Sequence, residues 1–111
     1  MNFGDAIKIN FSKYVDFNGR AARPEFWWFL LFLFLANVVL GVVSNAVSLI
    51  FSLATLLPSL AVGARRLHDT NRSGWWQLIG LIPLLGIIVL IVFWVQEGEA
   101  EDNPFGAAPE N

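Results

Sequence analysis

The feature that most constrains this chain is an uncharged stretch that runs from Phe26 to Ala64. As one straight helix, its 39 residues would extend about 58 Å at 1.5 Å per residue. The hydrocarbon core of a bilayer is only about 30 Å thick. The chain must therefore reverse within this stretch, and residues 41–45, which contain glycine, serine and asparagine, are the most polar place for the reversal.

This reversal predicts two membrane spans, 26–43 and 44–64, with Pro58 as a kink in the second. A third uncharged run, 75–95, would extend about 31 Å as a helix and predicts a third span. Within it, Pro83 stands between two glycines, and we expect it to bend the helix or to let a neighbour approach closely.

Composition supports a membrane class and excludes several others. Apolar residues make up 56% of the 111 residues and charged residues only 14%, well outside the usual range of a soluble domain. The net charge is -2, which gives no basis for nucleic-acid binding. The chain has no cysteine, so disulfides, thiol nucleophiles and thiolate metal sites are excluded, and no cofactor is expected.

The two ends of the chain flank a membrane domain at 24–95. Residues 1–23 begin with apolar side chains at four-residue intervals, from Phe3 to Val15, which predicts a short amphipathic helix. This helix either lies in the membrane interface with its lysines facing headgroups, or packs on the protein's own loops. Residues 96–111 combine acidic residues with proline, glycine and alanine, which predicts a flexible tail.

The distribution of cations predicts the orientation. All seven lysines and arginines precede the first span or lie between the second and third. The positive-inside rule then places the N-terminus and the 65–74 loop on the cytoplasmic side of the membrane. With three spans, the acidic tail would lie on the outer side.

The 65–74 loop and the tryptophan pair after it form a polar island between the two long apolar stretches. Its cations suit a helix end near headgroups, and Asp69 can pair with Arg65, Arg72 or a cation before the first span. A sharper hypothesis is a surface for anionic lipid headgroups or an acidic partner. The candidate residues for this surface are Arg20, Arg23, Arg65, Arg66, His68, Asp69, Arg72, Trp75 and Trp76.

His68 and Asp69 are the only pair in this island that resembles an acid-base or metal-ligand arrangement. A nitrogen and oxygen metal site normally needs further histidines or carboxylates nearby, so no metal is expected. A nucleophile at Thr70 or Ser73 would lie too near in sequence to converge with this pair as a triad. We therefore expect no enzyme activity.

The second predicted span carries a row of small residues on one helical face. Such a row is typical of a helix-packing seam, which Asn37 of the first span would meet, and a wet path through an oligomeric channel or transporter is the alternative. The row consists of Ser44, Ser48, Ser52, Thr55, Ser59 and Gly63.

Four short motifs carry a resemblance to a known family. They are Phe17-Asn18-Gly19-Arg20-Ala21, Arg65-Arg66-Leu67-His68-Asp69, Ser73-Gly74-Trp75-Trp76 and Asn103-Pro104-Phe105-Gly106. With them, nearly the whole chain resembles the small bacterial inner-membrane proteins grouped as domain of unknown function 805. The resemblance implies a multi-spanning helical protein of the cytoplasmic membrane. It implies no activity and no functional residues.

The sequence therefore predicts an all-α integral membrane protein with three transmembrane helices behind a short amphipathic interfacial helix. Its expected role is non-enzymatic, through lipid contacts or as an accessory component, with a small oligomeric transporter or channel as the alternative. The expected partners are the bilayer, with anionic phospholipid as one candidate, and a second copy of the chain or another membrane protein.

Overall fold

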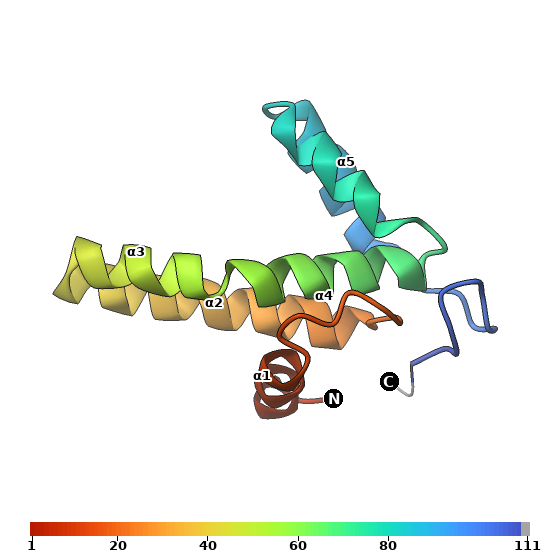
Figure 1. Cartoon of the computed structure of the whole chain (residues 1–111), viewed down its shortest axis with the longest axis horizontal. Coiled ribbons are helices and arrows are strands. Elements are labelled where there is room, and N and C mark those ends of the chain that lie inside the picture. Colours follow the sequence, from red (N-terminus) through yellow and green to blue (C-terminus); the bar gives the residue numbers. More distant parts are fainter. Residues whose placement is uncertain (110–111) are drawn as a thin grey trace.

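The computed structural model describes residues 1–109, and this part of the chain contains helices and no strand, as predicted. Figure 1 shows the long helix α2 lying beside α3 and α4, which follow one another along it. A shorter hairpin that contains α5 projects from them. The helices in chain order are α1 (Phe3–Ser12), α2 (Arg23–Val43), α3 (Asn45–Ala54), α4 (Leu56–Asp69), the 3-10 helix η1 (Gly74–Leu81) and α5 (Leu85–Val95).

Helix α1 is the predicted amphipathic helix, and it packs on α2. The Asn2 side chain caps it by accepting a 2.8 Å hydrogen bond from the backbone N–H of Asp5. The Phe3 and Phe11 rings meet Phe32 of α2 edge to face, with centroids 6.4 and 6.0 Å apart. The aromatic face of α1 therefore lies against the protein's own first long helix, while Lys8 is exposed.

The predicted reversal is confirmed at Ser44, where α2 ends and α3 begins. The extended backbone of Ser44 ends α2, and its hydroxyl caps α3 by accepting from the N–H of Val47. Pro24 lies in the first turn of α2, where its missing N–H costs nothing. The outer ends of α2 and α3 thus form an antiparallel pair, which extends to the left in Figure 1.

The predicted kink in the second span is also present. Helices α3 and α4 meet at Thr55 with a bend of 45°. Pro58 explains the position, because it cannot donate to the carbonyl of Ala54 four residues earlier and its ring would clash with that carbonyl. Thr55 and Ser59 hydroxyls instead donate to carbonyls within these turns.

The predicted third span at 75–95, with a bend at Pro83, is not confirmed, because these residues form a hairpin. The chain runs outward as η1, turns at residues 82–84 and returns as α5 against η1. Pro83 sits in this turn, and Gly86 supplies the predicted close approach. A Cβ atom at Gly86 would lie only 1.7 Å from the carbonyl oxygen of Ile79, so the two arms of the hairpin cross here at backbone contact.

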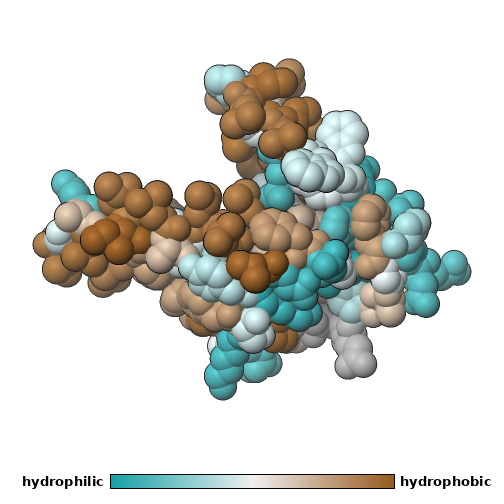
Figure 2. Space-filling model, viewed as in Figure 1, coloured by the Kyte–Doolittle hydropathy of each residue, from teal (hydrophilic) through white to brown (hydrophobic). Residues whose placement is uncertain are grey.

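Within residues 1–109, two helical segments are long enough and apolar enough to cross a membrane. Helix α2 is long and apolar enough by itself, and α3 with α4 meets the same criterion as one bent unit. Figure 2 shows two apolar lobes, the α2–α3 arm and the η1–α5 hairpin, joined to a more hydrophilic region. A third full span is not seen.

The close crossing at Gly86 predicts opposite outcomes for one substitution at two glycines. Gly86→Ala should destabilise the protein by about 1–3 kcal/mol, because backbone, unlike a flexible side chain, cannot move aside cheaply. Gly41→Ala should be neutral or stabilising by up to about 1 kcal/mol, because the new Cβ meets only the Ser48 hydroxyl at 3.9 Å in a helix interior. Thermal unfolding in detergent measures both, and equal shifts would contradict the hairpin crossing.

Candidate functional site: a buried arginine cluster

The last turns of α4 carry two adjacent arginines whose side chains are completely buried. Arg65 and Arg66 are both 0% exposed, and Asp69 one turn later is 4% exposed. Arg20, from the segment before α2, and Glu25, from the first turn of α2, are buried beside them. We call Arg20, Glu25, Arg65, Arg66 and Asp69 the arginine cluster.

Arg65 connects α4 to the N-terminal part of the chain. Its guanidinium forms an ion pair with Glu25, and Nη2 donates to the Asn10 side chain at 2.9 Å. Its Nε donates to the carbonyl oxygen of Asp16 at 3.1 Å. Asn10 in turn donates to the Glu25 carbonyl at 3.2 Å, so α1, α2 and α4 meet around one guanidinium.

Asp69 is shared between two arginines. Its Oδ2 lies 2.6 Å from Nη1 of Arg66, and its Oδ1 lies 2.9 Å from Nη2 of Arg20. The pairing of Asp69 across the loop with Arg20 was one of the predicted alternatives, whereas Arg65 pairs with Glu25 instead. Three cations face two carboxylates, and the guanidinium groups also donate to the Asn10 side chain and to several backbone carbonyls.

These carbonyls come from chain segments on both sides of the cluster. Arg66 donates to the carbonyl oxygens of Ala21, Trp94 and Gln96, which ties the end of α5 back to α4. Arg20 donates to the carbonyls of Glu99, Glu101 and Gly106. Within residues 1–109, no buried side-chain nitrogen or oxygen lacks a hydrogen-bond partner.

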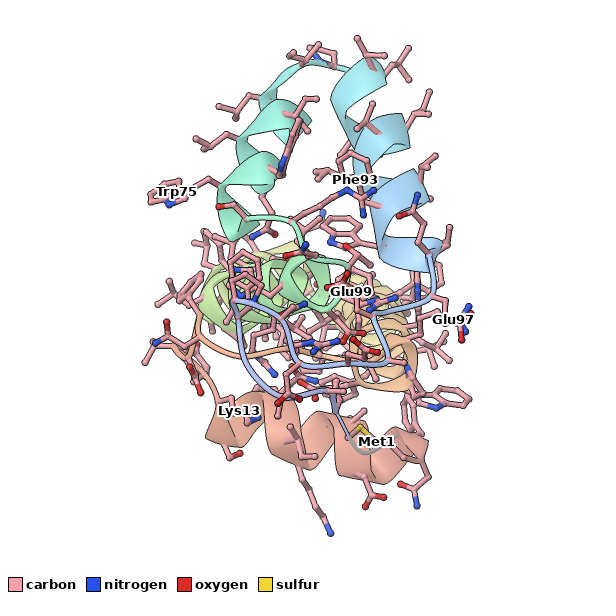
Figure 3. All side chains as sticks on the ribbon, turned by 90° about the vertical axis from the view of Figure 1, so that its right-hand side faces the viewer. Met1, Lys13, Trp75, Phe93, Glu97 and Glu99 are labelled. Atoms are coloured by element: carbon pink, nitrogen blue, oxygen red, sulfur yellow. The ribbon has the colours of Figure 1, made fainter. Side chains whose placement is uncertain are left out.

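The segment after α5 packs on the cluster end of the molecule, which differs from the predicted position across the membrane. The Glu99 N–H donates to the Asp69 carbonyl at 2.8 Å, and Asn103 donates to the His68 carbonyl at 2.9 Å. The Phe105 ring stacks on His68 with centroids 4.2 Å apart. Figure 3 shows Glu99 near the centre of this end and Glu97 pointing outward. Residues 110 and 111 of the predicted tail lie outside the described residues.

His68 and Asp69 do not act on each other. The His68 Nδ1 lies 2.9 Å from the Gly19 carbonyl oxygen, whereas the Asp69 carboxylate faces Arg20 and Arg66. The Thr70 hydroxyl donates to the Leu67 carbonyl, and the Ser73 hydroxyl accepts from the Trp75 N–H. No group of three or more potential metal ligands occurs in the described part of the chain.

The other candidate surface residues lie outside the cluster. Arg23 is exposed, and Arg72 lies 4.1 Å above the Phe93 ring while donating to Gln96 at 2.8 Å. Trp75 points away from the hairpin and is 77% exposed (Figure 3). Trp76 is 47% exposed. Of the predicted set, Arg20, Arg65, Arg66 and Asp69 are buried, His68 and Arg72 are half-buried, and Arg23, Trp75 and Trp76 are exposed.

Sequence reasoning missed the partners of the buried arginines. Neither Glu25 nor Asn10 was predicted from the sequence to contact Arg65. Glu25 had one sequence signal, because it is the carboxylate nearest the first uncharged stretch. Asn10 had none, because an amphipathic helix contains several polar residues. Carbonyl acceptors leave no sequence signal.

The row of small residues in α3 and α4 uses its hydroxyls internally. Ser48 and Ser52 donate to the Asn37 side-chain oxygen of α2 at 3.2 and 2.9 Å, which is the contact predicted for Asn37. Gly63, at the end of the row, lies close to Gln77 of η1, since a Cβ there would meet Gln77 Oε1 at 2.3 Å.

Fold and site together define a helical membrane protein. Hydrogen bonds from three buried arginines, Arg20, Arg65 and Arg66, connect its non-helical segments to the end of α4. The chain belongs to the family described as Protein of unknown function (DUF805), whose model matches residues 14–107. It is 42% identical to Inner membrane protein YhaI of Escherichia coli strain K12, over 87% of this chain and 88% of the relative. It is 40% identical to Inner membrane protein YhaH of the same strain, over 87% and 89%.

A weaker similarity of 35% links the chain to Uncharacterized protein YiiR of Escherichia coli, over 60% of this chain and 50% of the relative. None of these names includes an enzyme activity. No solved structure matches the chain. The family, the relatives and the apolar helices make this chain a bacterial membrane protein of unknown function.

The sharing of Asp69 predicts a large stability effect from one atom change. Asp69→Asn removes the only carboxylate that faces both Arg20 and Arg66 and leaves buried positive charge uncompensated, so we expect a loss of about 3–5 kcal/mol. Asp102→Asn is the matched control in the exposed tail and should change stability by less than about 0.5 kcal/mol. Comparable unfolding curves in detergent for both variants would refute a structural role for the cluster.

Proposed function

We propose that this protein is a non-enzymatic component of the bacterial inner membrane that acts by contacting another membrane protein or a second copy of itself. The observation that supports this proposal is that the α2–α3 pair and the η1–α5 hairpin expose apolar side chains that the rest of the described chain does not cover. Helix α3 has no buried residue, and Ile50 and Leu53 are 65% and 64% exposed. On α5, Ile88 is 57% exposed.

The proposed topology has two spans and a re-entrant hairpin. Helix α2 crosses once, α3 and α4 return as one bent span, and η1 with α5 enters and leaves on the same side. This hairpin is supported by its length, because its 11-residue helix α5 extends only about 16 Å, half of a hydrocarbon core. The N-terminus, the 65–74 loop and the tail then all lie on the cytoplasmic side, in agreement with the positive-inside rule.

The arginine cluster supports a structural rather than a catalytic role for the polar end. A catalytic group must be within reach of a substrate, whereas Arg65 and Arg66 are enclosed and fully hydrogen-bonded to protein atoms. Of the arginines in the anionic-headgroup hypothesis, Arg23 and Arg72 are the two that are not buried in the cluster and stay available to headgroups. The hydroxyl row supports helix packing, because Ser48 and Ser52 donate to Asn37 across the α2–α3 contact.

The topology can be tested with single cysteines, because the natural chain has none. We expect Glu101→Cys in the tail to react with a membrane-impermeant maleimide only after the inner membrane is opened, like Lys8→Cys in α1. Asn45→Cys, at the opposite end of α2, should react before that step. All three positions are exposed. A tail that reacts together with residue 45 would contradict the hairpin and restore three spans.

The interaction role predicts protein adducts from the apolar arms in native membranes. A photo-reactive amino acid at Ile50 or Ile88 should form a discrete cross-linked band, which mass spectrometry identifies as a second copy or another membrane protein. Lys8, on the polar face of α1, is the control position and should not give that band. Adducts with lipid alone at both arm positions would refute the proposed function.

A further inference from the structure

A cavity of about 600 Å³ lies where the hairpin meets the end of α4, outside the arginine cluster. Its walls come from α4, from η1, from the turn before α2 and from the Phe105 side chain of the tail. Residues near 18, between 60 and 78, and at 105 therefore line one space. The hydrogen bonds that hold the tail in place also position Phe105 at this cavity.

The wall of this cavity changes from apolar to polar along α4. Leu60, Ala64 and His68 line it at successive four-residue steps, so they share one helical face. On the opposite wall, η1 begins after Ser73, which lines the polar end of the cavity. Leu78 lies more than one turn farther along η1. The same order, polar head and apolar body, is that of a lipid standing along α4.

None of the side chains that line the cavity is charged. The nearest arginines on α4, Arg65 and Arg66, are buried in the cluster and turned toward their own partners. The polar side chains of the lining are those of Asn18, Gln77, Ser73 and His68. The Gln77 amide already donates to the Leu60 carbonyl, and the Ser73 hydroxyl already accepts from the Trp75 N–H. A net anionic head would therefore meet no cation here, which argues against the phosphate as the recognised group.

His68 presents a hydrogen-bond acceptor to this space. Its Nδ1 faces the Gly19 carbonyl oxygen at 2.9 Å, so the proton of the neutral ring lies on Nδ1 and Nε2 carries the lone pair. Stacking on Phe105 fixes the plane of the ring. A Cβ at Gly74 would lie 3.3 Å from Nε2, which directs Nε2 toward the η1 wall, and Nε2 has no hydrogen-bond partner in residues 1–109.

We propose that this cavity binds one membrane lipid whose head carries a hydrogen-bond donor, a primary amine or a hydroxyl, directed at His68 Nε2. The acyl part lies along Leu60 and Leu78 toward the bilayer. Among lipids without net charge, an ethanolamine phospholipid and a diacylglycerol both carry such a donor. The inference rests on the membrane placement proposed above, but on no protein partner.

The test measures lipid retention by native mass spectrometry on the full-length protein in nanodiscs. Phosphatidylethanolamine and phosphatidylcholine with identical acyl chains differ at the amine, which is a donor only in the former. We expect retention of ethanolamine lipid over choline lipid by about tenfold, the worth of one good hydrogen bond. A parallel experiment with diacylglycerol shows whether the cavity binds the amine or a hydroxyl. Equal retention of the choline lipid would overturn the proposal, as would a preference for anionic phosphatidylmethanol, which has no head donor.

Two variants connect the preference to the cavity. His68→Asn keeps an amide N–H near the position of Nδ1 for the Gly19 carbonyl but lacks Nε2, so the preference should fall to about equal retention. Leu78→Trp should reduce retention of the donor lipid by filling the apolar part. Leu81→Trp is the matched control, since Leu81 is on the same helix, 81% exposed and outside the cavity.

Circular dichroism and gel filtration show which variants remain folded. An unchanged preference in folded His68→Asn, or unchanged retention of the donor lipid in folded Leu78→Trp, would overturn the site. Loss of the preference in Leu81→Trp as well would do the same, because the effect would then not belong to the cavity. If the lipid result fails while the single-cysteine pattern holds, the membrane placement stands without this site.

Discussion

Two consecutive arginines buried at the end of α4 are the constraint on which the rest of the structure depends. A guanidinium carries five N–H groups and a fixed charge, and its burial is tolerated only when these groups find acceptors and the charge finds a carboxylate. Arg65 and Arg66 collect different acceptors. Arg65 binds the N-terminal segment and α2. Arg66 binds the end of α5, the Ala21 carbonyl and Asp69, which also pairs with Arg20. Lysine has only a single ammonium and could not span these positions.

The cluster concentrates specific contacts at one end of the molecule and leaves both arms apolar and open. Hydrophobic burial cannot hold helices together in lipid, since acyl chains are as apolar as leucine. Polar contacts therefore decide the arrangement: Asn37 with two serines holds α2 to α3, and the guanidinium groups hold the loops and the tail. The cavity beside His68 is a by-product of the same arrangement, because the tail that Arg20 binds also supplies Phe105.

The features that could be predicted were those set by length and local chemistry. An uncharged stretch twice as long as a bilayer must reverse, and Ser44 was within the most polar part of it. Pro58 must disturb the turn before it, and the bend is found at Thr55. The hairpin at 75–95 was not distinguished from a span, because its length suits either and Pro83 permits either. What decides is the position of the end of α5, which Arg66 holds against α4.

The sequence by itself determined the membrane class, the first reversal, the kink and the concentration of cations at one end, because charge, length and proline act locally. Only the tertiary structure decided that the arginines are buried, that Asp69 pairs with two of them and that the tail lies beside the C-terminal end of α4. The physical reason is that burial and hydrogen-bond satisfaction depend on acceptors from segments up to 86 residues apart, as between Arg20 and Gly106. Most of these acceptors are backbone carbonyls, which every residue carries and no residue type reveals.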